Sequence, residues 1–284
     1  MKYEFVKMHG AGNDYVYINC FEQDVADPEK LSIVLSDRHN GIGGDGLVLI
    51  CPSDKADAKM RMFNLDGSEG NMCGNAIRCV AKYVYDNDIA RKDRLSIETR
   101  SGIKTIDIKA KDNKFISAYV DMGKAILEPA KIPMSCGGES FISQPMTVDG
   151  KEYLATAVSM GNPHCVIFVD DVDSLELEKI GPKFENHPLF PDRVNTEFIK
   201  VTDKNNIQMR VWERGSGETL ACGTGSCAAV AACVLNGYAD YDTPVNVHLR
   251  GGVLTDTYYK NGTVIMEGIA TKVFSGIIDT NDID

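Results

Sequence analysis

The chain has 284 residues, of which 43% are hydrophobic and 25% are charged, a composition typical of one large globular domain or two of ordinary size. Its formal net charge is −11 and no cluster of Lys or Arg breaks this acidic balance, which argues against nucleic acid or an anionic membrane as a partner. No apolar run reaches membrane-spanning length and the first residues lack the apolar core of a signal peptide, so we expect a cytoplasmic protein.

The first half of the chain predicts several strands and two helices. Runs of β-branched and aromatic residues, separated by turn residues, mark the strands. A helix-like run begins at Pro28, and an apolar helix follows Cys73. The predicted strand runs occupy residues 15–20, 46–51, 96–110 and 115–123.

The second half shows the same order of elements after a crossover. The stretch from Gly123 to Gly150 carries three prolines and several glycines, which is typical of a connection between domains. A helix-like run ends at His187, and the helix after Cys222 is apolar all the way round, which predicts a buried helix. The predicted strand runs are residues 165–171, 195–201, 206–213 and 262–268.

The two halves resemble each other at a constant spacing. The segments that begin at Phe63 and Trp212 both run through a strand, a Gly-Ser turn and a Cys-Gly pair into an apolar helix. The two cysteines are Cys73 and Cys222, and 222 − 73 gives an offset of 149. The same offset maps Asn13 onto Asn162 and aligns the two helix-like runs. Such a repeat indicates an internal duplication.

We therefore predict an α+β fold of two pseudo-symmetric β-rich domains. Each domain is expected to wrap around a buried central helix, with the active site in the interdomain cleft. The predicted N-terminal domain carries Cys73 and covers residues 1–122 plus a C-terminal segment at about 271–284. The predicted C-terminal domain carries Cys222 and covers residues 123–270.

The nine cysteines do not predict a disulfide framework or a zinc site. Their number is odd, the chain is long, and no Cys-x-x-Cys pair occurs. Most of them are interpreted as small buried hydrophobic residues. This interpretation covers Cys20, Cys51, Cys79, Cys136, Cys227 and Cys233.

Two glycine-rich segments match dinucleotide-binding patterns. The segment GIGGDG at 41–46 follows a helix-like run and precedes a strand, the reverse of the order found in dinucleotide sites. The segment GTGSCA at 223–228 opens a helix, and Asp240 and Asp242 lie near the required distance downstream. The equivalent loop of the first half, CGNAIR, lacks the pattern, so a nucleotide-binding oxidoreductase is the weaker alternative.

The shared feature of the two cysteine segments is a helix N-terminus. Free N–H groups there bind anions, and a carboxylate suits them as well as a phosphate. A thiol at the same place is expected to have a lowered pKa. Two such thiols on opposite faces of one carbon could remove a proton from one side and deliver a proton to the other. The pattern thus favours inversion of an amino-acid centre.

Six motifs carry a family resemblance. The sequence resembles the diaminopimelate epimerases, a family of cofactor-independent amino-acid epimerases. The resemblance implies epimerisation of LL-2,6-diaminopimelate to the meso form, in the synthesis of lysine and peptidoglycan precursors, with no cofactor or metal and with homodimers often formed. The motifs are KMHGAGNDY, HNGIGGDG, FNLDGSEGNMCGNAIRC, SMGNPHCV, RVNTEF and ERGSGETLACGTGSCA, within residues 7–228.

The resemblance also implies roles for individual residues. Cys73 and Cys222 would be the two catalytic bases, and His164 would tune the site, whereas His9 is interpreted as structural. Arg214 can bind a distal carboxylate in a forked geometry, and Glu213 can bind an ammonium group. The implied substrate-binding residues are Asn13, Asn64, Gly74, Asn75, Asn162, Asn195, Glu213, Arg214, Gly223 and Thr224.

Some positions depart from the family pattern. Ala76 replaces the glycine of the common CGNG, and Thr224 replaces the serine of CGSG. Gly46 stands where some members carry Gln, so one distal contact would be missing or supplied by backbone. The alternatives left open are a racemase of another amino acid, such as histidine or proline, and a redox-sensing protein in which Cys73 and Cys222 form a reversible disulfide.

Overall fold

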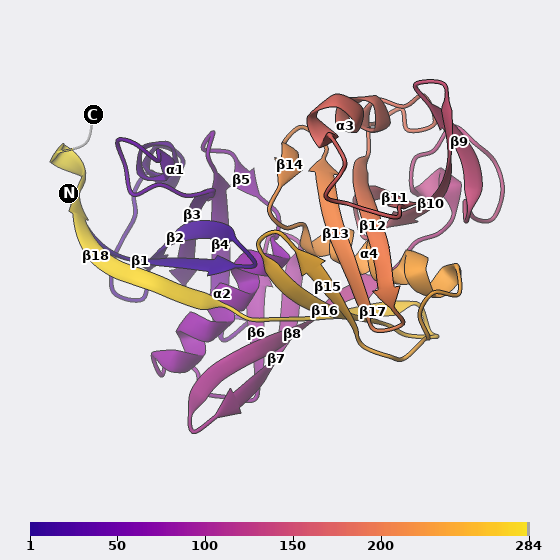
Figure 1. Ribbon diagram of the computed structural model, residues 1–284. Helices are drawn as coiled ribbons and strands as arrows, with labels where there is room; N and C mark the ends of the chain where they lie inside the picture. Colours follow the sequence, from indigo (N-terminus) through magenta and orange to yellow (C-terminus); the bar gives the residue numbers. More distant parts are fainter. Residues whose placement is uncertain (283–284) are drawn as a thin grey trace. The chain divides into compact units, whose positions relative to one another are not determined.

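A computed structural model describes residues 1–282, which divide into two compact units (Figure 1). The first unit comprises Met1–Val120 and the residues from Gly268 onward, and the second comprises Asp121–Glu267. The last strand of the chain thus belongs to the unit formed by the first residues. The domain boundaries predicted from the sequence, at residues 122 and 270, stay a prediction.

The first unit contains two α-helices among its described residues, α1 (Pro28–Ser36) and α2 (Gly74–Asp86). The strands of this part of the chain are β1 (Lys2–Gly10), β2 (Asn13–Asn19), β3 (Gly46–Cys51), β4 (Ala58–Asn64), β5 (Glu69–Gly70), β6 (Arg94–Thr99), β7 (Gly102–Lys111), β8 (Lys114–Lys124) and β18 (Thr271–Asp279), which the 3-10 turn η2 (Thr280–Asp282) follows.

The second unit contains α3 (Leu177–Glu185), α4 (Gly223–Leu235) and the 3-10 turn η1 (Pro129–Lys131). Its strands are β9 (Gln144–Val148), β10 (Lys151–Ser159), β11 (Pro163–Phe168), β12 (Asn195–Asp203), β13 (Asn206–Glu213), β14 (Gly217–Thr219), β15 (Val245–Leu249), β16 (Gly252–Tyr258) and β17 (Thr263–Gly268).

The strands pair in the same order in both units. In the first unit β18, β1, β2, β3, β4, β6, β7 and β8 are successive neighbours, with parallel pairing only at β2–β3 and β4–β6. In the second, β9 to β13, β15 and β16 are successive neighbours, with parallel pairing at β11–β12 and β13–β15. Mixed, mainly antiparallel sheets of this kind differ from the parallel sheets of dinucleotide-binding domains.

The internal duplication is confirmed element by element. The helices α1 and α3 begin 149 residues apart, at Pro28 and Leu177, and the 13-residue helices α2 and α4 begin at Gly74 and Gly223. The two units differ in which part of the chain supplies the edge strand that pairs with β1 in the first unit and with β10 in the second. In the second unit β9 precedes β10, whereas in the first unit β18 comes from the end of the chain. The predicted α+β fold class is confirmed.

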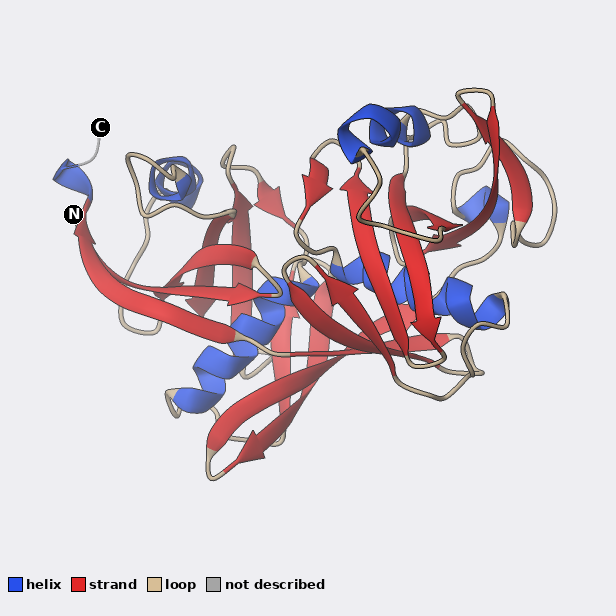
Figure 2. Cartoon of the chain, in the orientation of Figure 1, coloured by secondary structure: helices blue, strands red, loops and turns tan. Residues whose placement is uncertain are grey.

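In each unit the two helices cover different faces of the sheet (Figure 2). Strand residues alternate between faces. Val16 and Leu47 point to one face, where they pack with Leu31 and Leu35 of α1. The helix α2 instead contacts β1, β2, β4, β6 and β7, and in the second unit α4 contacts β10, β11, β12, β15 and β16. Because α4 is buried from Gly225 to Val234, the predicted burial of this apolar helix is confirmed.

The cysteine interpretation holds only in part. In the described residues no cysteine is joined in a disulfide, and Cys79, Cys227 and Cys233 are buried as predicted. The prediction of burial is wrong for Cys20, Cys51 and Cys136, which are partly exposed. The physical reason is position, because Cys20 and Cys51 lie at strand ends and Cys136 lies in a loop, whereas the buried thiols lie on α2 and α4. In the part of the chain described here, each helix is too short or too polar to span a bilayer.

Candidate active site

Cys73 is the N-cap residue of α2. Its backbone is extended (φ −136°, ψ 122°), and its sulfur accepts a hydrogen bond from the N–H of Ala76 at 3.5 Å. The Cys73 thiol donates to Oδ1 of Asn13 at 3.3 Å. Two of the residues that the sequence analysis assigned to the site, Cys73 and Asn13, are therefore in direct contact within the first unit.

Asn13 is itself held in place by charged neighbours. Its Nδ2 donates to Oδ2 of Asp45 at 2.8 Å, and Arg38 binds both Asp45 and Asp14. Burial opposes ionisation of Asp14, but hydrogen bonds from Arg38 and Lys7 outweigh it and lower the pKa of this carboxyl. The ion-pair network thus fixes the loop before β3 against the start of β2, where Asn13 lies.

Tyr15 is a further residue beside Cys73. It is buried, and burial raises the pKa of its phenol above the usual range, with the nearby Cys73 acting in the same direction. A neutral phenol at this position provides a polar group next to the thiol without adding charge. The sequence analysis did not select Tyr15, because it reads as an ordinary strand residue in β2.

The other predicted residues of the first unit lie at two separate elements. Asn64 ends β4 and donates to Oγ of Ser68 at 2.9 Å. Gly74 and Asn75 form the first turn of α2, where backbone N–H groups have no acceptor within the helix. The side chain of Asn75 is buried, and its Oδ1 accepts from Nη2 of Arg78 at 2.6 Å.

Arg78 is a buried cation that the sequence analysis missed. Its Nη1 also donates to the carbonyl of Gly74 at 3.0 Å, so it ties down the first turn of α2. A Cβ at Gly10 would approach Arg78 and the Asn75 backbone to within about 3.2 Å, which explains the glycine there. An arginine inside an otherwise apolar helix was the available signal, since fully buried arginines are rare without a partner.

Cys222 occupies the equivalent position at α4. It is the N-cap residue, its backbone is extended (φ −123°, ψ 113°), and its sulfur accepts from the N–H of Gly225 at 3.3 Å. The hydroxyl of Thr224 lies 3.5 Å from the sulfur. The two halves of the duplication therefore place a thiol at the same point of the same helix with the same local bond.

The expectation of a lowered thiol pKa is wrong for Cys222. Burial raises the pKa of Cys222 well above its usual range, and the carboxylates of Glu213 and Glu197 act in the same direction. The hydrogen bonds with Thr224 and the N–H of Gly225 oppose this effect but do not outweigh it. The helix terminus alone suggested a thiolate, whereas the surrounding tertiary structure favours the neutral thiol.

A chain of hydrogen bonds leads from Thr224 into the core of the second unit. The Thr224 hydroxyl accepts from Nδ2 of Asn162 at 3.3 Å, and Oδ1 of Asn162 lies 3.0 Å from Nε2 of His164. Nδ1 of His164 lies 2.7 Å from Oε1 of Glu197. Because Oδ1 of Asn162 can only accept, His164 donates from Nε2.

Glu197 is the second buried charged group that the sequence analysis missed. It is fully buried on β12, and burial raises its pKa while His164 opposes that shift. A Cβ at Gly225 would lie 2.7 Å from Oε1 of Glu197, so this glycine leaves space for the carboxyl group. The motif RVNTEF contained Glu197, but its sequence position gave no sign that it faces His164.

The residues predicted to bind the distal end of a substrate lie at the end of β13. Glu213 accepts from the hydroxyl of Thr219 at 2.5 Å, and Nη1 of Arg214 donates to the carbonyl of Asp192 at 2.9 Å. Asn195 is buried, and its side-chain amide bonds to two backbone groups. Its Nδ2 donates to the carbonyl of Pro163 and its Oδ1 accepts from the N–H of Arg214, each at 2.9 Å. Asn195 thus positions the Arg214 backbone.

Glu185 holds the turn after β13 from the side of α3. Its Oε2 accepts from Nε1 of Trp212 at 2.8 Å, and its Oε1 accepts from the N–H of Gly215 at 2.9 Å and from Arg193 at 3.0 Å. This buried carboxylate was also missed, because in sequence it resembles a solvent-facing residue near the end of an amphipathic helix. In sequence, Arg214 lies between Trp212 and Gly215, and both of these residues donate hydrogen bonds to Glu185.

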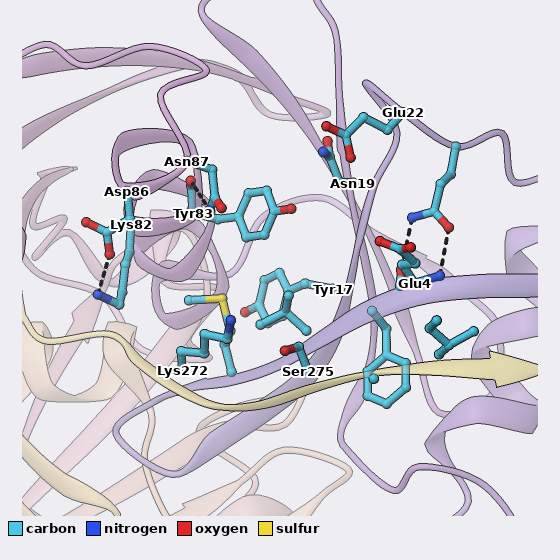
Figure 3. A pocket seen from close by; sticks show the side chains of 16 residues that line it. Glu4, Tyr17, Asn19, Glu22, Lys82, Tyr83, Asp86, Asn87, Lys272 and Ser275 are labelled. Atoms are coloured by element: carbon cyan, nitrogen blue, oxygen red, sulfur yellow. Dashed lines mark hydrogen bonds and ion pairs between the residues drawn. The ribbon is translucent and has the colours of Figure 1, made fainter.

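A cavity of about 490 Å³ in the first unit lies away from these groups. Figure 3 shows Lys82 and Asp86 at its wall, joined by a 2.6 Å ion pair, together with the Tyr17 ring and Lys272. The predicted site residues are not among the described residues that line it. Charges of both signs surround the cavity, and we do not assign it to the candidate active site.

The described residues offer no group of three or more His, Cys, Asp or Glu side chains arranged to hold a metal ion. The groups described above at the two helix termini are thiols, backbone N–H groups and amides.

Comparison with known proteins identifies the family. The model of the diaminopimelate epimerase family matches residues 5–128 and 156–273. The chain belongs to this family. Every residue that the sequence analysis assigned to the site lies inside the two matched ranges, and so do Arg78, Glu185 and Glu197.

Relatives of the diaminopimelate epimerase family are similar over nearly their whole length. A diaminopimelate epimerase of Acetivibrio thermocellus is 53% identical over 279 residues, covering 98% of this chain and 99% of that protein. One of Agathobacter rectalis is 54% identical over 284 residues, covering 97% and 99%. One of Methanococcus maripaludis is 50% identical, covering 97% and 99%.

Solved structures of more distant proteins share the fold. A Bacillus anthracis phenazine biosynthesis protein of the PhzF family has a TM-score of 0.72 at 15% identity, covering 98% of this chain and 99% of that chain. A hydroxyproline epimerase from Agrobacterium vitis has a TM-score of 0.66 at 12% identity, covering 98% and 91%. At these identities the comparison establishes the fold that this epimerase family adopts.

Proposed function

We propose that this protein is a diaminopimelate epimerase, an isomerase that interconverts LL- and meso-2,6-diaminopimelate in lysine and peptidoglycan precursor synthesis. The observation that carries the proposal is the equivalence of Cys73 and Cys222. Each thiol caps a central helix and accepts the N–H of the residue three positions later. Family membership and the names of the relatives support the same activity.

Inversion at the α-carbon would proceed by two proton transfers. A thiolate on one face of the carbon removes the α-proton, and a thiol on the other face delivers a proton. The N–H groups at the first turns of α2 (Gly74, Asn75) and α4 (Gly223, Thr224) would bind the α-carboxylate. These donors would also stabilise the negative charge that develops on the carboxylate as the proton leaves. The reaction as written requires no cofactor.

The two cysteines would differ in protonation during the reaction. The raised pKa of Cys222, caused by burial and by Glu213 and Glu197, supports a neutral thiol there. A two-base reaction then needs a thiolate at Cys73, which would form when Cys73 loses the proton that it donates to Oδ1 of Asn13. The chain from Thr224 through Asn162 and His164 to Glu197 would keep the Cys222 side of the site in one arrangement, with His164 as a positioning residue.

Recognition of the distal end would decide the substrate. Glu213 and Arg214 offer a carboxylate for an ammonium group and a guanidinium for a carboxylate, which suits a second amino-acid group. A racemase of proline or histidine would gain little from that pair. The amides proposed to orient the substrate are Asn13, Asn64, Asn162 and Asn195, the last acting through the Arg214 backbone.

The test is solvent-hydrogen exchange. The purified chain, kept under reductant with no cofactor added, is incubated with LL-diaminopimelate in D₂O, and deuterium at the α-carbon is followed by NMR. We expect exchange with this substrate and none with proline or histidine. Cys73→Ala and Cys222→Ala should each abolish epimerisation, while the partly exposed Cys136→Ser should retain it. Exchange confined to proline or histidine, or epimerisation that survives Cys73→Ala, would overturn the proposal.

We further propose that the protein is a cytoplasmic homodimer. Support comes from apolar side chains on β18 that face solvent in the single chain, with Val273 56% and Ile277 68% exposed. Exposed apolar groups on one strand are typical of a surface that pairs with another molecule. Light scattering coupled to size exclusion should give twice the mass of 31.1 kDa; a monomer at micromolar concentration would contradict the dimer.

A further inference from the structure

Cys20 directly follows β2 and Cys51 ends the neighbouring strand β3, at the same level of the sheet. The parallel pairing of β2 and β3 matches Asn19 with Ile50, and the N–H of Cys20 donates to the carbonyl of Ile50 at 2.8 Å. One residue further along both strands are the two cysteines. Adjacent strands lie about 4.8 Å apart, and disulfides join Cα atoms about 4.4–6.8 Å apart. The backbone therefore already holds this pair within disulfide range.

The two thiols also point the same way. Along β2 the residues of this face include Val16 and Ile18, and along β3 they include Leu47 and Leu49, all in one hydrophobic cluster that Cys20 and Cys51 contact at its edge. Both thiols are partly exposed, in contrast to Cys79 and Cys233, which are buried. Small oxidants in solution can thus reach the pair.

Two cations flank one member of the pair. The antiparallel partner β4 places Lys59 opposite Cys51 and Arg61 opposite Leu49, so both cations lie on the face of the thiols. A hydrogen bond from Cys20 lowers the pKa of Cys51, and Arg61 and Lys59 act in the same direction against burial. The same hydrogen bond, with burial, raises the pKa of Cys20.

We propose that Cys20 and Cys51 form a redox-active dithiol, separate from the epimerase site, that a hydroperoxide converts to a disulfide. The sequence separates the two cysteines by 31 residues, and the fold assigns them unequal roles. Cys51 is the thiol that reacts with peroxide and Cys20 is the resolving thiol. This inference does not depend on the proposed epimerase activity, because none of the residues proposed for that reaction takes part.

The chemistry balances with hydrogen peroxide as the oxidant. The Cys51 thiolate attacks one peroxide oxygen, the O–O bond breaks, and the released hydroxide takes a proton to leave as water, which makes Cys51 a sulfenic acid. The Cys20 sulfur then attacks the Cys51 sulfur. The S–S bond forms, the S–O bond breaks, and the Cys20 proton leaves with the hydroxide as a second water. A thiol reductant reverses the change by disulfide exchange.

The first test maps the products of mild oxidation. The full-length reduced protein is treated with equimolar hydrogen peroxide, blocked with N-ethylmaleimide and digested without reductant. We expect mass spectrometry to find a Cys20–Cys51 linked peptide, released by dithiothreitol, while Cys79 and Cys233 stay reduced. Persistence of both thiols when other cysteines are oxidised, or oxidation of Cys51 without the cross-link, would overturn the proposal.

The second test separates the two roles. In Cys20→Ser the Cys51 sulfenic acid has no resolving thiol, so dimedone should label Cys51 after peroxide treatment. In Cys51→Ser, dimedone should leave Cys20 unlabelled under the same conditions. Equal labelling of the two variants, or labelling only of Cys20, would contradict the assignment. If a variant fails to fold, the reaction rates of the two thiols with iodoacetamide can be compared in the wild-type chain. We expect Cys51 to react about 10-fold faster than Cys20. Equal rates would overturn the assignment of roles.

Discussion

Nδ1 of His164 lies 2.7 Å from Oε1 of Glu197, and neither side chain is exposed to solvent. The pair joins β11 to β12 inside the second unit and ends the hydrogen-bond chain that begins at Thr224. A buried pair of this kind is costly to break, because the remaining partner stays buried without its counterpart.

The stability of the second unit should depend on the Glu197 oxygen. We expect Glu197→Ala to lower the free energy of unfolding by about 3 kcal/mol, since His164 loses its hydrogen-bond partner. Glu197→Gln keeps a hydrogen-bonding group and a similar volume, and should cost about 1 kcal/mol. Urea denaturation followed by circular dichroism measures both. Equal losses in the two variants would contradict this prediction, because they would show that the polar group and volume retained by Gln do not stabilise the unit.

The pH dependence of alkylation should report the state of Cys222. An acid with a raised pKa stays protonated to higher pH, and only the thiolate reacts with iodoacetamide. Since burial, Glu213 and Glu197 raise the pKa of Cys222, its alkylation should rise at a higher pH than in the same chain unfolded in denaturant, where the midpoint is about 8.5. Peptide mass spectrometry gives the profile. Coincident midpoints in the folded and unfolded chains would contradict the neutral thiol.

Gly225 should tolerate no side chain. A Cβ there would lie 2.7 Å from Glu197 Oε1 and 3.2 Å from Cys222 Sγ, so Gly225→Ala has to displace one of them. We expect a loss of about 1–3 kcal/mol in unfolding free energy. Gly223→Ala is the matched control in the same helix turn, because its Cβ would meet Met266 Sδ at an ordinary 3.4 Å. Thermal unfolding that ranks Gly223→Ala as the less stable variant would refute this reasoning.

Glu185 should influence substrate binding through the turn that carries Arg214. Glu185→Ala leaves Trp212, Gly215 and Arg193 without their acceptor and loosens that turn. We expect KM for diaminopimelate to rise about tenfold, with a smaller change in kcat. Glu176→Ala, at the exposed start of the same helix, is the control and should leave both constants unchanged. An unchanged KM in Glu185→Ala would remove Glu185 as a positioning residue.

The duplication explains why so much of the fold could be predicted. Matching Cys73 with Cys222 fixed one offset, and that offset then located α1 and α3, α2 and α4, and the loops before them. Strand and helix patterns depend on neighbouring residues, so they can be read locally. The helix caps at Cys73 and Cys222 are local features too, since each thiol bonds an N–H only three residues away.

What could not be predicted depends on contacts between distant parts of the chain. Glu197 lies 33 residues from His164, Glu185 lies 27 residues from Trp212, and Cys20 lies 31 residues from Cys51. Nothing in the immediate sequence of a strand glutamate shows that a histidine will face it. The pKa of Cys222 was predicted with the wrong sign for the same reason. The helix terminus is a local effect, whereas burial and the nearby carboxylates arise from the assembled unit.

The pairing of β18 with β1 has a consequence for the order in which the protein is made. The first strand obtains one of its two neighbours from residues 271–279, which the ribosome adds after the whole of the second unit. The second unit is continuous from Asp121 to Glu267, so its residues are all present before β18 is made. We therefore expect the later-synthesised unit to be complete first, the reverse of the usual N-terminal-first order. A nascent chain would keep an open sheet edge at β1 until residues 271–279 have been added, and we expect chaperone protection to matter most in that interval.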